Sequence, residues 1–196
     1  MDGGRIRANV DITLIMGHMG AGKTTTGVAQ IADAYAKDPS YMVLSNMKLY
    51  GIKHIYQPDI NATLKLLISR PDFNHIKWLV DESYVGGDSR RSMSTSSVVC
   101  SWVLQQARKR DMEIAYIAQH PRMLDWRFSW AANKRIECVK YDWDEEKRRG
   151  TRNIKIIVKD IDKKTEKTIS YWGPQYWKYY NTNEVPEIPE KVLARL

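Results

Sequence analysis

Short apolar runs alternate with helical stretches along the first half of the chain. Residues 12–16 form an apolar run that ends at a glycine, as a buried parallel strand does. Residues 23–36 carry apolar side chains at the spacing of one helix face, and Pro39 follows them. The alternation continues with predicted strands at residues 41–44, 76–80 and 113–118 and predicted helices at residues 60–69 and 98–108. Asp59 is suited to cap the helix at residues 60–69. This order predicts an α/β fold of three layers, with helices on both faces of a mainly parallel sheet.

The pattern changes after Trp130. Three runs look like strands with no helix between them, and residues 162–165 suit a hairpin turn between the last two. These runs are residues 135–141, 153–161 and 167–172. We expect them to extend the same sheet in antiparallel fashion. The proline-containing end of the chain, residues 173–196, predicts an arm on the surface.

The length of 196 residues fits one α/β domain. We therefore expect residues 1–196 to form a single domain, with a core over residues 10–141 and antiparallel strands over residues 135–172. The hydrophobic fraction of 43% is sufficient for a core that needs no disulfide or metal. Cys100 and Cys138 are too few for a zinc ribbon and favour two buried free thiols. No apolar run is long enough to span a membrane, and no signal peptide is visible.

The chain is basic, with 31 Lys and Arg against 23 Asp and Glu and a formal net charge of +8. Most of this excess lies between Ser101 and Ser170. A basic surplus of this kind suits a polyanionic partner such as nucleic acid, although charge alone does not require one.

A glycine-rich motif follows the first predicted strand and precedes the first predicted helix. It fits the pattern G-x-x-x-x-G-K-[ST] of a phosphate-binding loop, and its context of strand before and helix after is the required one. Backbone N–H groups of such a loop and the N-terminus of the helix bind phosphate, the lysine reaches the β- and γ-phosphates, and the hydroxyl binds Mg²⁺. The predicted ATP-binding residues are Gly17, His18, Met19, Gly20, Ala21, Gly22, Lys23, Thr24 and Thr25.

Two carboxylates end the third predicted strand. The carboxyl ends of parallel strands lie at the same edge of a sheet, so Asp81 and Glu82 are expected beside the phosphate-binding loop. Asp81 is predicted to hold Mg²⁺ together with Thr24, and Glu82 is predicted to orient or deprotonate the attacking water. ATP and Mg²⁺ are thus the predicted cofactors of an ATP hydrolase.

Further polar residues lie near the fourth predicted strand, and each has two interpretations. Gln119 ends that strand and either touches the γ-phosphate or is a solvated strand end. Arg108, Lys109 and Arg110 close the helix before it, either as cations that stabilise a helix C-terminus or as the source of an arginine finger for a neighbouring subunit. The spacing of the residues leaves both questions open.

The order of these elements resembles the FtsK/HerA superfamily of DNA-pumping ATPases. The resemblance covers about residues 11–135 and rests on the loop, the Asp-Glu strand, the arginine-rich helix and the strand ending in Ala118-Gln119-His120-Pro121. The short single-domain form is similar to genome-packaging ATPases of membrane-containing icosahedral viruses, including archaeal ones. The resemblance implies a RecA-like fold, Gln119 as a polar sensor, and Arg108 or Arg110 as a finger acting in trans.

The same resemblance implies a homo-oligomeric ring with double-stranded DNA in its channel. It further implies docking to capsid or vertex proteins and a place in the host cytoplasm and the virion. Two other functions stay open, a nucleoside or small-molecule kinase and a nucleotide-binding assembly protein without motor activity. The aromatic segment 171–180 either stacks on bases or packs on the core, and residues 86–91 form a DNA-facing loop or a connector.

Overall fold

One sheet of eight strands organises the chain in this computed structural model. The structure describes residues 11–81, 103–107, 109–119, 126–139, 143–144, 149–150 and 152–181, without the side chains of 126–128, 143–144 and 149–150. The strand order is β10-β9-β6-β1-β5-β4-β2-β3. The parallel strands are β1 (Ile12–Met16), β2 (Met42–Ser45), β3 (His54–Tyr56), β4 (Ile76–Asp81), β5 (Met112–Ala118) and β6 (Lys134–Val139). Two antiparallel strands, β9 (Asn153–Asp160) and β10 (Thr165–Trp172), complete it.

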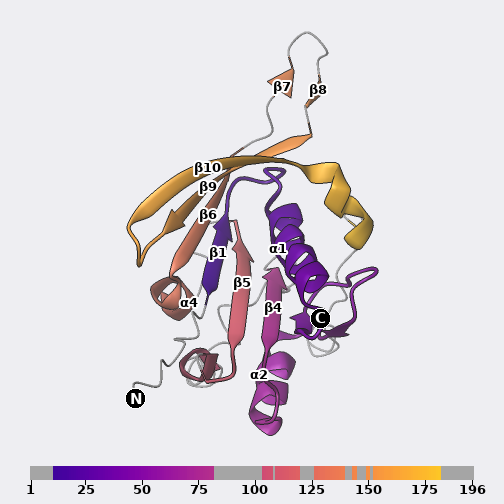
Figure 1. Cartoon of the computed structure of the whole chain (residues 1–196), viewed down its shortest axis with the longest axis vertical. Helices are drawn as coiled ribbons and strands as arrows, with labels where there is room; N and C mark the ends of the chain where they lie inside the picture. Colours follow the sequence, from indigo (N-terminus) through magenta and orange to yellow (C-terminus); the bar gives the residue numbers. More distant parts are fainter. Residues whose placement is uncertain are drawn as a thin grey trace, which may run out of the picture.

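Helices cover both faces of the sheet, which confirms the predicted three layers (Figure 1). Helix α1 (Lys23–Lys37) packs on one face through Val28 and Ile31. Helix α2 (Ile60–Ser69) and the helical residues 103–107 contribute to the core on the other face, and α4 (Trp126–Ala131) contacts β1. Neighbouring residues of β1 point to opposite faces, with Leu14 in one core cluster and Ile15 in the other.

Most of the predicted elements form where the sequence places them. The Asp59 side chain accepts a hydrogen bond from the Asn61 amide and caps α2, as predicted. The described part of the predicted helix 98–108 is helical over residues 103–107, and its start lies outside the described residues. The strand β3 was not predicted, because its three residues are too few to show a pattern.

One strand of the predicted antiparallel extension runs the other way. β6 pairs parallel with β1, so the antiparallel part of the sheet begins at β9. The helix α4, which precedes β6, was missed in the sequence, and a connection across one face of the sheet makes the next strand parallel. The turn at residues 161–164 joins β9 to β10 as a hairpin, as predicted.

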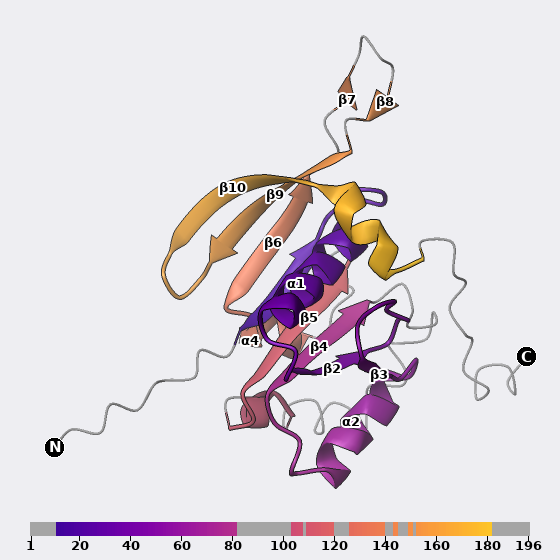
Figure 2. The ribbon, with the colours of Figure 1, turned by 45° about the vertical axis from the view of Figure 1, so that its right-hand side comes forward.

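The C-terminal segment returns to the face that α1 covers. After β10, the 3₁₀ helix η3 (Gly173–Tyr179) packs beside α1 (Figure 2). We call the described part of this segment, residues 173–181, the C-terminal arm. The short ladder of β7 (Trp143–Asp144) and β8 (Arg149–Gly150) lies at the end of the sheet where β1 enters the glycine-rich loop (Figure 1).

Candidate nucleotide site

The glycine-rich loop joins β1 to α1 and lies tightly against β6 and β9. Gly22 is the N-cap of α1 with φ of 88°, a left-handed conformation that favours glycine. A Cβ atom on Gly22 would lie 2.9 Å from Ile154 Cδ1, and one on Gly17 would lie 2.5 Å from the Cys138 carbonyl oxygen. Both positions therefore favour glycine for conformation, and Gly17 also needs it for space because the close atom is a backbone oxygen.

The loop presents a cationic, donor-rich concavity at the start of α1. The Lys23 ammonium group donates a hydrogen bond to the His18 carbonyl oxygen at 2.9 Å, so the lysine lies back over the loop. The first N–H groups of a helix have no partner within it, and the helix dipole favours an anion at this end. A phosphate chain fits this combination of charge and donors.

The loop meets the end of β4 through a direct side-chain contact. The Thr24 hydroxyl donates a hydrogen bond to Asp81 Oδ2 at 2.8 Å, and only 2% of Asp81 is exposed. Asn46, at the end of β2, pairs with the Asp81 backbone in both directions at 2.8 Å, as donor to its carbonyl oxygen and acceptor from its amide. Asp81 is thus held in one position beside the hydroxyl of the loop.

The strand order places Gln119 between the glycine-rich loop and Asp81. β5 lies between β1 and β4, with Ala118 level with Met16 and Ile117 level with Asp81. Gln119 follows directly after β5 and is exposed. The loop, Gln119 and Asp81 therefore lie on three adjacent strands at one edge of the sheet, where ligands of such sheets bind.

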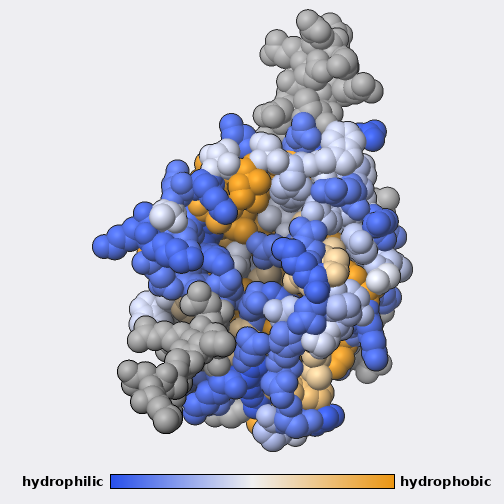
Figure 3. Space-filling view, in the orientation of Figure 1, coloured by the Kyte–Doolittle hydropathy of each residue, from blue (hydrophilic) through white to orange (hydrophobic). Residues whose placement is uncertain are grey.

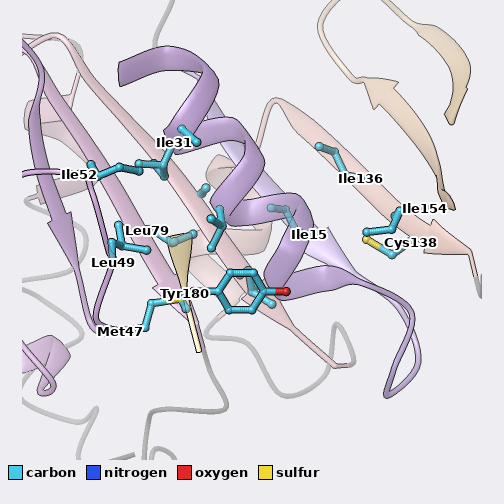
Figure 4. Close-up of a cluster of buried hydrophobic side chains, with 14 of the residues drawn as sticks. Ile15, Ile31, Met47, Leu49, Ile52, Leu79, Ile136, Cys138, Ile154 and Tyr180 are labelled. Carbon is cyan, nitrogen blue, oxygen red and sulfur yellow. The ribbon is translucent and has the colours of Figure 1, made fainter. Parts of the chain in front are cut away.

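A cavity of about 480 Å³ opens between the loop and the C-terminal arm. Its lining consists of Gly20, Gly22, Lys23, Thr24, Thr25, Trp177, Tyr180 and Asn181. Tyr180 is buried beside the first turn of α1, and the Thr25 and Tyr180 hydroxyls lie 2.5 Å apart (Figure 4). This volume falls within the range of about 300–1,000 Å³ typical of small-molecule sites.

A larger groove of about 830 Å³ lies elsewhere, between α1 and the strands β6, β9 and β10, and its lining includes no residue of the glycine-rich loop. Its lining mixes ion pairs with the side chains of Ile156, Val158 and Ile169. Hydrophobic residues are visible among hydrophilic ones on the face of the molecule that Figure 3 shows. The smaller cavity, which contains Lys23 and Thr24, is the candidate site.

The predicted site residues fall into three groups. Those from Gly17 to Thr24 lie together with Asp81 and near the strand end that carries Gln119, whereas Thr25 turns inward to Tyr180. Glu82 and Arg108 lie outside the described residues. Arg110 lies before β5, at the opposite end of the sheet, where it is 7% exposed and donates to the Leu67 carbonyl oxygen at 2.6 Å.

Three residues that hold the loop and Asp81 in place were missed in the sequence. Asn46 follows an apolar strand as Asp81 does, and this position at a strand end was the available signal. Tyr171 and Tyr180 bond to the hydroxyls of Thr26 and Thr25, at 2.8 and 2.5 Å. The cluster of aromatic residues at 171–180 drew attention to them, but contacts across 145 and 155 residues leave no local pattern.

Oxygen ligands at the loop suit a magnesium ion. Mg²⁺ prefers hard oxygen ligands and is usually bound by one or two carboxylates together with substrate phosphates and water. The Thr24 hydroxyl and the Asp81 carboxylate, 2.8 Å apart, match that donor set. Among the described residues, no group of three or more His, Cys, Asp or Glu side chains forms a metal site complete in itself.

The thiol of Cys138 is buried behind the loop, as the sequence predicted. Its Sγ atom lies 3.3 Å from the Thr26 hydroxyl, and burial raises the pKa of the thiol. Cys100 lies outside the described residues. Within the part of the chain that the structure describes, no helix is long and apolar enough to cross a membrane.

Comparison with known proteins shows the fold of the chain. No protein-family model and no curated protein sequence matches it. The N-terminal domain of zonular occludens toxin from Neisseria meningitidis is similar in structure, with a TM-score of 0.62, 16% identity, and coverage of 88% of this chain and 99% of that chain.

Two further structures are similar over most of the chain. The genome packaging NTPase B204 from Sulfolobus turreted icosahedral virus 2, in complex with ATP-γ-S, has a TM-score of 0.56 and 12% identity, covering 81% of this chain and 96% of that one. A KaiC-like protein from the hyperthermophilic archaeon Pyrococcus horikoshii has a TM-score of 0.52 and 11% identity, covering 81% of this chain and 82% of that one. At these identities the likeness establishes the fold, that of a P-loop NTPase.

Proposed function

We propose that the chain is an ATP-hydrolysing motor that moves double-stranded DNA and packages a viral genome. The observation that carries the nucleotide chemistry is the hydrogen bond between Thr24 in the loop and Asp81 at the end of β4. It joins a phosphate-binding loop to a buried carboxylate, and this pair of oxygen donors suits a metal-bound triphosphate. The fold shared with an NTPase that packages a viral genome supports the motor assignment.

ATP binding follows from the arrangement of the loop. The backbone N–H groups of residues 17–24 surround the phosphates, and Lys23 leaves the His18 carbonyl oxygen to bind the β- and γ-phosphates. Thr24 and Asp81 would hold Mg²⁺, and the bound ion would neutralise phosphate charge.

Hydrolysis needs a positioned water and stabilisation of the developing charge. Glu82, next to Asp81, orients or deprotonates the water, as an ordinary general base does. Gln119 lies at the edge between the loop and Asp81, and its amide contacts the γ-phosphate or the water. Arg108 of a neighbouring subunit supplies the finger, because the buried and hydrogen-bonded position of Arg110 favours a structural role for that residue.

The proposed DNA binding and the proposed assembly into a ring are supported by the charge of the chain and by its fold. The net charge of +8 suits a phosphate backbone, and contacts to phosphates give salt-sensitive and sequence-tolerant binding. A homo-oligomeric ring provides a channel and shared active sites. Docking to capsid or vertex proteins, and association with the virion, belong to the same proposal.

Phosphate release separates this proposal from the two alternative functions. The wild-type chain is expected to release phosphate from ATP without an acceptor, and DNA is expected to change the rate. A nucleoside kinase would need a nucleoside, and an assembly protein would bind ATP without turnover. Lys23→Ala is expected to abolish binding or turnover, whereas the control Lys37→Ala, at the exposed far end of the same helix, keeps both. Near-normal hydrolysis by Lys23→Ala would refute the site.

Oligomeric state and DNA binding test the motor. Mass measurement with a non-hydrolysable ATP analogue and duplex DNA is expected to detect a ring that carries DNA. Filter binding is expected to show an affinity that falls steeply with salt and depends little on sequence. A monomer that ignores DNA, yet hydrolyses ATP, would leave the ATPase assignment standing and refute the motor.

A further inference from the structure

We infer that Trp177 of the C-terminal arm is the stacking surface for the base of the bound nucleotide. This inference rests on the proposed nucleotide binding at the loop and extends it, because it assigns the part of the site that recognises the base. Trp177 lines the same cavity as Lys23 and Thr24. A nucleotide whose phosphates occupy the loop therefore has an indole ring within the cavity that remains for its sugar and base.

The exposure of Trp177 is unusual for its position. The side chain is 40% exposed although it lines a cavity. An indole buries a large apolar area when it is covered, so an uncovered one at a concave site favours a ligand with a flat apolar face. Trp130 and Trp172, the other strongly exposed tryptophans among the described residues, do not line this cavity.

The arm that carries Trp177 is fixed at three points around it. The Tyr176 hydroxyl donates to both carboxylate oxygens of Asp33 on α1 at 3.0 Å. The Tyr50 amide donates to the Tyr179 carbonyl oxygen at 2.8 Å, and the Tyr180 hydroxyl bonds with Thr25. Because residues on both sides of Trp177 are held in place, the ring is presented before a ligand arrives and little ordering is needed on binding.

Neighbouring groups complete the environment of the ring. The Arg152 guanidinium lies 5.7 Å from the centre of the Trp177 ring, within the range of a cation–π contact. Stacking on an aromatic side chain is available to every base because every base has a π-face. The subsite should therefore favour nucleotides over bare polyphosphate without choosing strongly between ATP and GTP.

The test compares ligands with and without a base. Binding of ATP and GTP, each as its non-hydrolysable analogue, and of inorganic tripolyphosphate, all with Mg²⁺, is measured by calorimetry on the full chain, its Trp177→Leu variant and its Trp177→Phe variant. Leucine keeps apolar volume without a π-face, and phenylalanine keeps a π-face. Trp130→Leu, at an exposed tryptophan of α4, is the matched control, and circular dichroism verifies that each variant is folded.

Trp177→Leu is expected to weaken ATP and GTP by about 5- to 150-fold, the loss of one stacked base. Tripolyphosphate should bind all variants alike, and Trp177→Phe should recover most of the nucleotide affinity. Equal ATP affinity for the leucine and phenylalanine variants, or an equal loss of tripolyphosphate, overturns the base subsite. If the wild-type chain binds neither ATP nor tripolyphosphate, the proposed function itself fails, which distinguishes the two failures.

Discussion

The buried Arg110 allows structural and catalytic roles to be separated by one substitution. Its guanidinium donates to the carbonyl oxygen of Leu67, which is itself fully buried in α2, and 7% of Arg110 is exposed. A hydrogen bond from a charged donor contributes about 1.5–3 kcal/mol, and the buried stem of arginine adds packing energy. Removing the buried charge also removes its desolvation cost, which offsets part of this loss. Arg110→Ala should therefore lower the free energy of unfolding by about 2–4 kcal/mol.

The assay is urea unfolding together with ATP hydrolysis. With a denaturant slope of about 2 kcal/mol per molar urea, the midpoint should fall by roughly 1–2 M. Hydrolysis, measured where the variant is fully folded, should stay within a few-fold of wild type. Lys109→Ala, at the exposed neighbouring residue, is the control and should change neither quantity.

The opposite result would refute this reasoning. An arginine finger acts on the transition state and contributes about 10³-fold or more to the rate. Arg110→Ala with unchanged stability and a loss of that size would return Arg110 to the finger role. If Arg108→Ala slows hydrolysis instead, mixing it with Glu82→Gln subunits should restore activity through interfaces that pair an intact finger with an intact base.

Three further predictions concern Glu82, Asp81 and His75. Glu82→Gln should bind ATP but not hydrolyse it, as nucleotide binding and phosphate release will test, and loss of binding with an intact fold would give Glu82 another role. Asp81→Asn should raise the Mg²⁺ concentration needed for half-maximal hydrolysis, because its carboxylate, bonded to Thr24, loses its charge; an unchanged magnesium titration would contradict the metal assignment. Hydrogen bonds to Asp111 and, to a smaller extent, Asp38 raise the pKa of His75. The stability that His75 adds relative to His75→Asn should therefore be full below about pH 6.5 and fall as pH rises through the raised pKa. Urea unfolding of both proteins across pH measures this, and a difference between their midpoints that stays constant with pH would contradict it.

The parts of the fold that could be predicted are those with local signals. The glycine-rich loop is a run of eight residues, and its strand and helix are visible on either side of it. Asp81 was predictable because a carboxylate ended an apolar run, and the carboxyl end of that strand was expected beside the glycine-rich loop. The direction of β6 was not predictable in this way, since parallel and antiparallel strands of six residues have the same alternation.

The contacts that hold the site in place are long-range and were therefore missed. Asn46 and Asp81 are 35 residues apart, and Thr25 and Tyr180 are 155 apart. Tyrosine in an aromatic cluster is compatible with core packing, with base stacking and with hydrogen bonding. Only the folded arrangement shows that Tyr180 packs and bonds while Trp177 stays open to the cavity.

The two ends of the described chain contribute to one candidate site, because the antiparallel strands and the C-terminal arm contact the glycine-rich loop and α1. Ile154 of β9 packs so closely against the loop that a Cβ atom on Gly22 would lie 2.9 Å from its Cδ1 atom. Tyr171 of β10 bonds to Thr26, one turn into α1, and the arm bonds to Thr25. A displacement of the loop would therefore disturb its contacts with β9, β10 and the arm together, because packed interiors transmit strain.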